Sequence, residues 1–424
     1  MRIFARRALL PEGWRSNVTI DVDAAGTITR VADGQTSRDA TEFANTLVPG
    51  MPNLHSHAFQ RAMAGKAERR SRDRDDFWSW RETMYALAAT LDPDELHRIA
   101  LGTYRAMLRA GYTAVAEFHY LHRDPTGAWY ADKCAMAAAL VSAARDVGLA
   151  ICLLPALYTQ ANPAGAPLGE RQKRFLAGPD DVLEIAAALR TRYAHDPGVV
   201  VAVCAHSLRA ATLAQFRALL DGSPHDVPVH LHIAEQEREV AEIEAAYGAR
   251  PIEVLLGSFA VDERWCLVHA TQATVDELRA IAETGAIVGL CPTTEANLGD
   301  GIFPFEPFAR AGGHFGIGSD SNVSISPVAE LRLLEYGQRL TQRRRIIAAN
   351  DARSCGEALY AEAAASGARA CGSRSGALAP GLRADFIELP DDGGEDADPL
   401  DCYILAGLQP FPARVVTGGH WRRV

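Results

Sequence analysis

Residues 46–57 read TLVPGMPNLHSH, an apolar, strand-like run that becomes polar at its carboxyl end. His55 and His57 are two positions apart, so on a strand both side chains point to the same side. Two imidazoles on one side of a strand can share a metal ion. Pairs of buried histidines without a metal are also common, so the rest of the chain decides what this pair means.

Seven further apolar runs follow, each leading into a segment with helical periodicity: residues 113–120, 150–158, 199–207, 227–235, 265–271, 286–294 and 314–321. One of the intervening segments, 274–285, has capping residues at both ends, Thr274 with Glu277 at the start and Gly285 at the close. Eight strand–helix units predict a (β/α)8 barrel, an α/β fold. The alternative, a doubly wound open sheet, needs a glycine-rich phosphate loop after an early strand, and the sequence has none.

Short strands separated by turn residues fill both ends of the chain. At the C-terminal end they are expected at 384–390, 402–407 and 413–424. We therefore predict a small β-sandwich domain built from both termini. The expected division is 1–48 for its N-terminal part, 49–375 for the barrel and 376–424 for its C-terminal part.

The composition narrows the class of protein. The 424 residues include 48% hydrophobic and 23% charged residues, typical of a globular protein and not of a disordered one. The net charge of −10 argues against nucleic acid or an anionic membrane as a partner. No apolar run is long enough for a membrane helix, and no signal peptide is recognisable. We expect a cytoplasmic protein with free buried thiols, notably Cys152, Cys204, Cys266 and Cys291.

Polar residues gather where the predicted strands end, which is where the active site of a barrel lies. They are His55, His57, His206, His230, His232, Glu235, His269, Ser319 and Asp320. Imidazoles combined with one carboxylate suit zinc or iron, with water at an open position. His230 is more simply a packed histidine, and His314 lies at a strand start, which is the wrong end of the barrel.

The chain resembles the amidohydrolase superfamily in PGMPNLHSHAFQRAMAG (49–65), HLHIAEQ (230–236), LVHAT (267–271), GIGSDSNVS (316–324) and GLRADFIELP (381–390). Within that superfamily, HSHAFQRAMAG, FWSWRETMY, EFHYLH, HSLRA and HIAEQ look like formimidoylglutamate deiminase. That family hydrolyses N-formimino-L-glutamate to N-formyl-L-glutamate and ammonia in histidine degradation.

The resemblance implies a metal site and separate roles for the metal ligands and the catalytic residues. It implies one Zn2+ per chain, with Fe2+ as a possible substitute, ligated by His55, His57, His232 and Asp320. It also implies that His269 and Glu235 act on the water and the leaving group, and that the protein is a homodimer. Sites of this type with two metals usually place a carbamylated lysine on the fourth strand. Residues 199–207 contain no lysine, so we expect one metal.

Chemical reasoning gives these residues roles on a small dicarboxylate amidine. Zinc lowers the pKa of bound water to about 7. Asp320 or His269 then accepts the proton of the attacking water, and both assignments stay open. Glu235 lies three residues beyond His232 and can pass a proton to the departing nitrogen. Gln60, three residues beyond His57, can hold the amidine.

The two carboxylates of such a substrate need cations or hydrogen-bond donors. Arg209 follows His206 by three residues, and Tyr120 ends the second strand. Arg81 lies within FWSWRE, after an arginine-rich stretch that on its own would indicate a solvated surface. We expect Arg209, Arg81, Tyr120 and His206 to form an anion pocket. The aromatic residues Phe77, Trp78, Trp80 and Tyr85 suggest that part of this region covers the barrel mouth as a lid.

Two other functions remain to be separated from this one. A related deaminase acting on a heterocyclic amine, such as guanine, cytosine or adenosine, would use the same metal ligands but would need no paired arginines. A non-catalytic binding protein on the same fold would be expected to have lost the ligand histidines, and this sequence retains them.

Overall fold

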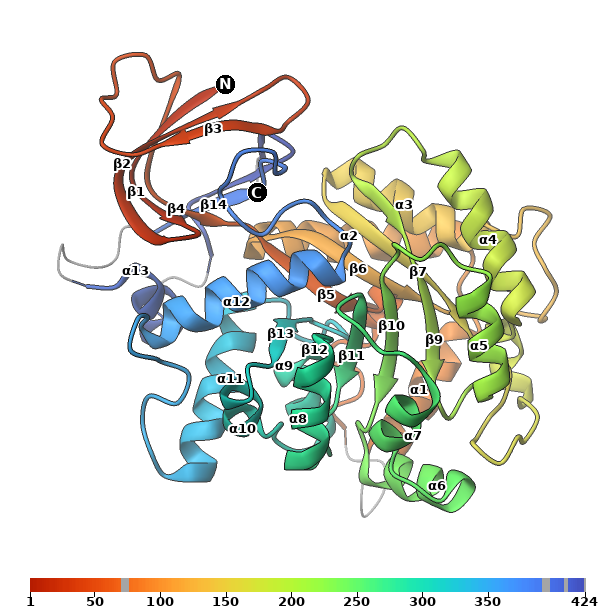
Figure 1. The fold of residues 1–424 in the computed structure, drawn as a ribbon. Coiled ribbons are helices and arrows are strands. Elements are labelled where there is room, and N and C mark those ends of the chain that lie inside the picture. The colour runs from red at the N-terminus through yellow and green to blue at the C-terminus, as the bar shows by residue number, and fades with distance from the viewer. Residues whose placement is uncertain (70–75, 391–396, 408–410, 423–424) are drawn as a thin grey trace.

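A computed structural model of the chain describes residues 1–69, 76–390, 397–407 and 411–422. Two sheets organise it (Figure 1). One is a mixed sheet built from the two chain ends, and both termini lie beside it in Figure 1. The other consists of the parallel strands from the middle of the chain, surrounded by helices. The predicted α/β class, with a barrel and a small terminal β domain, is thereby confirmed.

The terminal sheet has seven strands in the order β16-β15-β14-β4-β1-β2-β3. Its own core joins apolar side chains from both chain ends, such as Ile3, Ile20 and Phe386. The strands are β1 (Arg2–Leu10), β2 (Gly13–Val22), β3 (Ile28–Ala32), β4 (Glu42–Pro49), β14 (Phe386–Leu389), β15 (Arg414–Thr417) and β16 (His420–Arg422).

The barrel strands pair in parallel in the order β13-β12-β11-β10-β9-β7-β6-β5. They are almost entirely buried, as expected for strands covered by helices on one side and packed around a common interior on the other. The strands are β5 (Met51–Ser56), β6 (Tyr112–His119), β7 (Ala150–Leu157), β8 (Val199–Val201), β9 (Val203–Ser207), β10 (Val229–Ile233), β11 (Trp265–His269), β12 (Ile287–Leu290) and β13 (His314–Ile317).

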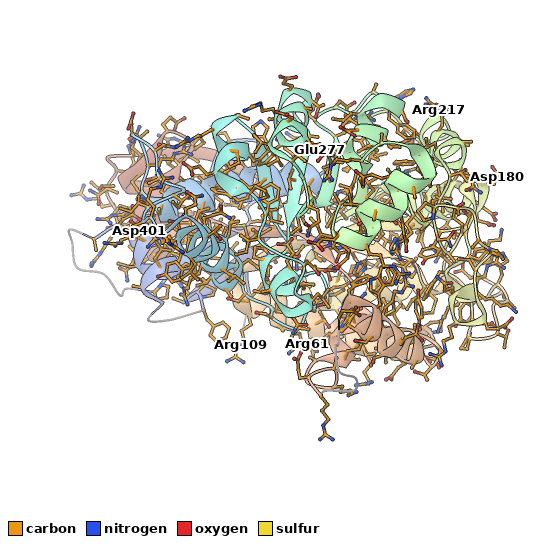
Figure 2. The ribbon with its side chains drawn as sticks, turned by 90° about the horizontal axis from the view of Figure 1, so that it is seen from below. Arg61, Arg109, Asp180, Arg217, Glu277 and Asp401 are labelled. Carbon is orange, nitrogen blue, oxygen red and sulfur yellow. The ribbon has the colours of Figure 1, made fainter. Side chains whose placement is uncertain are left out.

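Helices cover the outside of the barrel, with polar residues such as Asp180 and Arg217 at the edge of the molecule (Figure 2). Helix α8 has the predicted caps at Thr274 and Gly285. The helices are α1 (Phe77–Ala88), α2 (Pro93–Ala110), α3 (Ala135–Val147), α4 (Pro179–Arg192), α5 (Leu213–Asp221), α6 (Glu237–Tyr247), α7 (Pro251–Ser258), α8 (Val275–Thr284), α9 (Pro292–Leu298), α10 (Phe305–Arg310), α11 (Pro327–Gln342), α12 (Cys355–Ala370) and α13 (Pro399–Asp401), with shorter turns η1 (Ala58–Met63), η2 (Glu170–Phe175) and η3 (Cys402–Ala406). None of the described helices is both long and apolar enough to cross a membrane.

The barrel closes between its first and last strands through the backbone next to β5 and β13. The His57 N–H donates to the Asp320 carbonyl and the Asp320 N–H to the His55 carbonyl, both at 2.9 Å. A buried side-chain bond from Asn53 Nδ2 to Ser319 Oγ, 2.6 Å long, joins the same two segments. Arg61, labelled in Figure 2, donates to the carbonyls of Asn322 and Val323. The loop that carries Asp320 is therefore fixed to the first strand.

Three local expectations were wrong. Residues 402–407 are helical, because Asp398 caps a helical start at Pro399 and Gly407 closes the turn in the left-handed conformation. The run 199–207 is two strands, β8 and β9, which pair with successive parts of β7. The run 46–57 is also divided: β4 belongs to the terminal sheet and β5 to the barrel, with Gly50 between them. A Cβ at Gly50 would lie 2.3 Å from the Thr113 side chain, so the backbone passes there only as glycine.

Gly318→Ala should destabilise the protein. A Cβ there would lie 2.8 Å from both Cβ and O of His55, where the barrel closes. Overpacking of this kind costs about 1–3 kcal/mol. Gly102→Ala is the matched control, because position 102 is an exposed site inside α2 with nothing within 4 Å. That substitution should stabilise the protein by about 0.5–1 kcal/mol. Urea unfolding of both variants checks this, and equal midpoints would contradict it.

Candidate metal centre and active site

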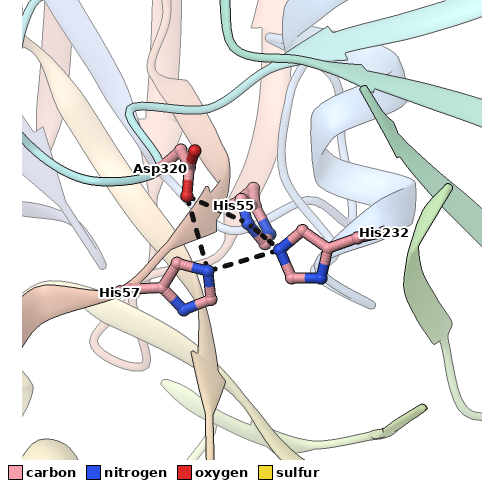
Figure 3. Close-up of side chains that lie close together, drawn as sticks. All are labelled: His55, His57, His232 and Asp320. Carbon is pink, nitrogen blue, oxygen red and sulfur yellow. Dashed lines mark hydrogen bonds and ion pairs between the residues drawn. The ribbon is translucent and has the colours of Figure 1, made fainter. Parts of the chain in front are cut away.

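Four side chains from three strand ends converge inside the mouth of the barrel (Figure 3). His55 and His57 come from the end of β5, His232 from β10 and Asp320 from the loop after β13. One donor atom from each lies within 4.8 Å of the donor atoms of the others. Asp320 adopts a positive φ of 44°, an uncommon conformation for a non-glycine residue. The backbone bonds of the barrel closure hold it in that conformation.

The distances within this cluster are those of ligands around a common centre. His55 Nε2 and His232 Nε2 are 3.0 Å apart, and His57 Nε2 and His232 Nε2 are 3.3 Å apart. Asp320 Oδ1 lies 3.4 Å from Nε2 of both His55 and His57. All four side chains are buried.

In two of these histidines, His57 and His232, the hydrogen bond made by Nδ1 fixes the tautomer of the ring. His57 Nδ1 donates to the Phe118 carbonyl at 2.9 Å, and His232 Nδ1 donates to the His206 carbonyl at 2.8 Å. A carbonyl only accepts, so the proton is on Nδ1 and both Nε2 atoms present lone pairs. Backbone partners of this kind are typical of metal-ligating histidines.

Burial keeps these imidazoles neutral. It lowers the pKa of His57 to about 3 and holds the pKa of His232 and of His55 below the ordinary value. The facing Nε2 atoms of His57 and His232 therefore have no proton to share, and their lone pairs repel. A cation removes that repulsion. The donor set of three imidazoles and one carboxylate thus fits a divalent metal ion.

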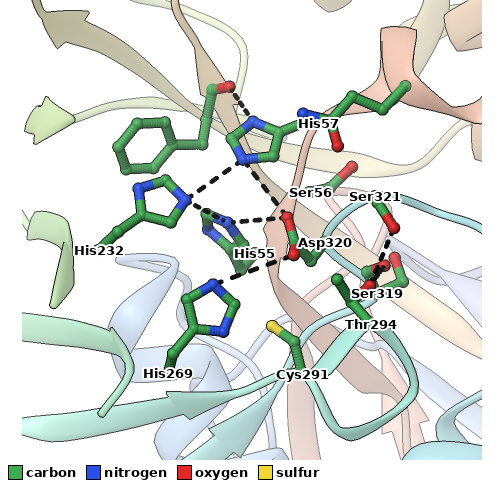
Figure 4. Close-up of polar contacts among 12 residues, drawn as sticks. His55, Ser56, His57, His232, His269, Cys291, Thr294, Ser319, Asp320 and Ser321 are labelled. Carbon is green, nitrogen blue, oxygen red and sulfur yellow. Dashed lines mark hydrogen bonds and ion pairs between the residues drawn. The ribbon is translucent and has the colours of Figure 1, made fainter. Parts of the chain in front are cut away.

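His269 lies next to the cluster, and Figure 4 shows it facing Asp320. Its Nδ1 is 3.2 Å from Glu295 Oε1, and its Nε2 is 3.9 Å from Asp320 Oδ2 and 3.7 Å from Glu235 Oε1. Burial alone would lower the pKa of His269, but Glu235 and Glu295 raise it to about 10. Glu295 also accepts the Cys291 N–H at 2.9 Å, so it holds the ring from α9.

Glu235 is a buried carboxyl group whose nearest cationic partner is His269, with Nε2 3.7 Å from Glu235 Oε1. Burial raises its pKa to about 7, opposed by His269 and assisted by Asp320. At neutral pH it therefore exists in both protonation states, as a group that moves protons must.

One cavity joins the metal cluster to a cationic wall and encloses about 520 Å³ of space, part of it open to solvent. Every predicted site residue lines it except His55, which lies behind. The cationic wall consists of Arg81 from α1 and Arg209 from the loop after β9. Nε and Nη1 of Arg81 and Nη1 of Arg209 are buried and have no hydrogen-bond partner among the described residues.

Gln60 and Tyr120 lie between the two sides of the cavity. Gln60 Nε2 donates to the Tyr120 hydroxyl at 2.9 Å, and Gln60 Oε1 is buried without a partner in the described chain. His206 contributes a ring that stacks on His232, with centroids 4.9 Å apart. The cavity thus offers free donors at one end and a free acceptor near the metal cluster.

Sequence reasoning missed two residues, Tyr158 and Glu295, and the rule that functional residues follow strand ends would have found only the first. Tyr158 follows β7 and lines the cavity, although the run 150–158 had been read only as a strand. Glu295 lies beyond the seventh strand and orders His269. The remaining predictions for histidines agree with the structure: His230 packs with Nε2 2.8 Å from the Ala370 carbonyl, and His314 pairs with Glu362 at a strand start. Of the arginine-rich stretch, Arg70, Arg72 and Arg74 lie outside the described residues.

Comparison with known proteins gives the class. The model of the amidohydrolase family matches residues 46–406, so the chain belongs to that family. A second model, for the N-terminal domain of formimidoylglutamate deiminase HutF, matches residues 1–42. Together with the buried donor set, the family indicates a divalent metal.

Individual relatives place the chain more narrowly within the amidohydrolase family. Formimidoylglutamate deiminase from Pseudomonas aeruginosa is 46% identical, covering 99% of this chain and 94% of the relative. The chain therefore belongs to the formimidoylglutamate deiminase branch of the family. A crystal structure of an amidohydrolase from Brucella melitensis has a TM-score of 0.94 and 43% identity, covering 99% and 94% of the two chains. An 8-oxoguanine deaminase from Pseudomonas aeruginosa is 27% identical over 90% of this chain and 82% of its own.

Two histidine variants on one strand should differ in metal content. His232→Asn removes a donor atom from the cluster, so the purified protein should lose most of its metal. His230→Gln alters the neighbouring histidine, which contacts the Ala370 carbonyl and not the cluster, so its metal content should stay at the wild-type value of about one ion per chain. Elemental analysis after gel filtration measures both. Equal metal contents in the two variants, or two ions per wild-type chain, would contradict this assignment.

Proposed function

We propose that this protein is a zinc-dependent deiminase that hydrolyses N-formimino-L-glutamate to N-formyl-L-glutamate and ammonia. The observation that carries the proposal is the cavity itself. Its lining brings His57, His232 and Asp320 of the metal-ligand cluster together with two arginines that have unused donors. The relative at 46% identity is named for this activity.

In the proposed reaction the water oxygen adds to the amidine carbon, and the bond from that carbon to the terminal nitrogen then breaks. A zinc ion bound by His55, His57, His232 and Asp320 would supply Lewis acidity that makes the water a better nucleophile. Fe2+ suits the same donors. Every other step falls to side chains of the protein.

The two oxygens of Asp320 support two roles. Oδ1 faces the histidine Nε2 atoms, while Oδ2 faces His269 Nε2 at 3.9 Å. Asp320 can therefore hold the metal with one oxygen and accept the water proton with the other. His269 is positively charged and lies beside Asp320. That charge suits a group that stabilises the negative charge developing on the oxygen that adds to the amidine carbon. We accordingly favour Asp320 over His269 as the first base.

Glu235 is proposed as the proton carrier to the leaving nitrogen. Its Oε1 lies 3.7 Å from His269 Nε2, and its pKa of about 7 suits both accepting and donating a proton at neutral pH. The departing nitrogen must leave as ammonia, so it has to gain protons before the bond breaks. Gln60, with its free Oε1, is proposed to accept a hydrogen bond from the amidine.

The carboxylates of the substrate are assigned to the opposite wall. Arg209 and Arg81 have the planar donors that carboxylates pair with, and both leave some of them unused within the described chain. Tyr120 and His206 complete the proposed pocket. A heterocyclic amine would leave these charges without partners, which is costly for buried groups. This disfavours the heterocyclic-amine alternative.

The proposal also covers the domains, the oligomeric state and the cellular compartment of the protein. We propose a small terminal domain of residues 1–48 and 376–424 around a barrel of 49–375. We also propose a cytoplasmic homodimer that acts in histidine degradation. The buried free thiols of Cys152, Cys204, Cys266 and Cys291 support a reducing compartment.

The purified enzyme should release ammonia from N-formimino-L-glutamate and none, at a comparable rate, from guanine, 8-oxoguanine, cytosine or adenosine. Chelation should abolish the activity, and added Zn2+ should restore it. A coupled ammonia assay measures each substrate. Faster release from any of the heterocycles than from N-formimino-L-glutamate would reject the proposed substrate.

Arg209→Ala should lower kcat/KM for N-formimino-L-glutamate by more than about tenfold, because a charged bidentate contact is lost. Arg217→Ala is a matched control on the next helix, where the arginine is exposed and donates to the Ser258 carbonyl. Steady-state kinetics measure both variants. An effect below about twofold in Arg209→Ala would remove this residue from the pocket.

A further inference from the structure

Trp78 is surrounded by arginines, although it does not line the cavity. It is the second residue of α1 and is half-buried. The centre of its ring lies 4.4 Å from Cζ of Arg81, 5.6 Å from Cζ of Arg209 and 4.1 Å from Cζ of Arg238. All three distances are within the range of a cation–π interaction. Two of these arginines form the cationic wall of the cavity.

That wall presents an electrostatic problem. Arg209 is buried and Arg81 is half-buried, and each disfavours the charge of the other. Among the described residues, Nε and Nη1 of Arg81 and Nη1 of Arg209 are buried without a hydrogen-bond partner. Glu239 and Glu235 favour the charge of Arg209, whereas burial and the charge of Arg209 lower the pKa of Arg81. A source of negative potential beside Arg81 would therefore stabilise the pair.

We propose that Trp78 is a positioning residue, whose ring face holds Arg81 and Arg209 as a preformed pair for the carboxylates of the substrate. The inference rests on the proposed function, since it concerns the same cavity. Its physical basis is the negative face of the aromatic ring.

An aromatic face does what a carboxylate could not do at this place. A carboxylate beside Arg81 would occupy its N–H donors and would compete with the substrate. A ring attracts the guanidinium through its face and leaves the N–H groups in the plane free. The unpaired Nε and Nη1 of Arg81 and Nη1 of Arg209 agree with this arrangement. The pair is thereby kept in place with its donors available.

Arg238 has a different position in the same cluster. Its side chain is exposed and pairs with Glu242 at 2.7 Å, and it does not line the cavity. It contacts the indole from an exposed position on α6, the helix that follows the Glu235 segment. Trp78 thus connects α1 to two segments of the barrel mouth.

The test compares aromatic and aliphatic replacements. Trp78→Leu should raise KM for N-formimino-L-glutamate by about tenfold while kcat stays within about threefold, because the arginines lose their order but the metal cluster is untouched. Trp78→Phe should keep KM within about threefold, since it retains a ring face. If Trp78 only filled space, Trp78→Leu and Trp78→Phe would have the same KM, provided that the two variants are equally stable. Trp78→Met, an unbranched helix former, replaces Trp78→Leu if the latter does not fold.

Trp129→Leu is the matched control. Its ring lies 4.0 Å from Cζ of Arg123 and 5.0 Å from Nζ of Lys133, and it does not line the cavity. Its removal deletes a similar cation–π contact, and KM should stay at the wild-type value. A rise in KM equal to that of Trp78→Leu would overturn the proposal.

A binding measurement separates this inference from the proposed function. Glutarate carries two carboxylates and no amidine, so calorimetry reports the cationic wall without catalysis. Wild type and Trp78→Phe should bind it, and Trp78→Leu should bind it about tenfold more weakly. If the wild type binds glutarate but releases no ammonia, the proposed function fails and the positioning role stands. If Trp78→Leu binds glutarate as the wild type does, or the wild type does not bind it, the positioning role is rejected.

Discussion

The repulsion between facing histidine nitrogens is the constraint on which the rest of the site depends. His57 and His232 point bare Nε2 atoms at each other across 3.3 Å, because backbone carbonyls hold both protons on Nδ1. The fold maintains this arrangement through the bonds that close the barrel between β5 and β13. A cation is what makes the arrangement favourable. Metal binding and barrel closure are therefore coupled: the backbone that carries His55 and His57 is the same backbone that holds Asp320.

The cavity divides its charge between two ends, and this division fits an acidic protein with an anionic substrate. Asp320, Glu235 and Glu295 lie around His269, and the cavity that Asp320 and Glu235 line is also lined by Arg81 and Arg209. The net charge of −10 argues against extended anionic partners but says nothing about a pocket of this size. Local burial matters more than net charge here, because charges in a confined site are less screened than those at the surface.

Much of this could be predicted from the sequence, because barrel strands place their last residues in one layer. The rule that polar residues at strand ends meet was sufficient to bring together His232, His269 and Asp320 before any distance was known. It failed where a residue acts from outside the strand: Glu295 reaches His269 from α9. Strand prediction failed at 402–407, because an apolar run is equally compatible with a helix and Asp398 decides for the helix.

The origin of each side chain explains how relatives with this fold can differ in substrate. The metal-ligand cluster belongs to the barrel strands and their immediate ends. Arg81 and Trp78 belong to α1, an excursion between the first and second strands, and Arg209 lies in a loop. The relatives named for heterocyclic substrates match most of this chain at much lower identity. Segments outside the strands can change without disturbing barrel closure. In the proposed function, selectivity for carboxylates would come from α1 and the loop after β9, whereas the metal-ligand cluster comes from the barrel strands and their ends.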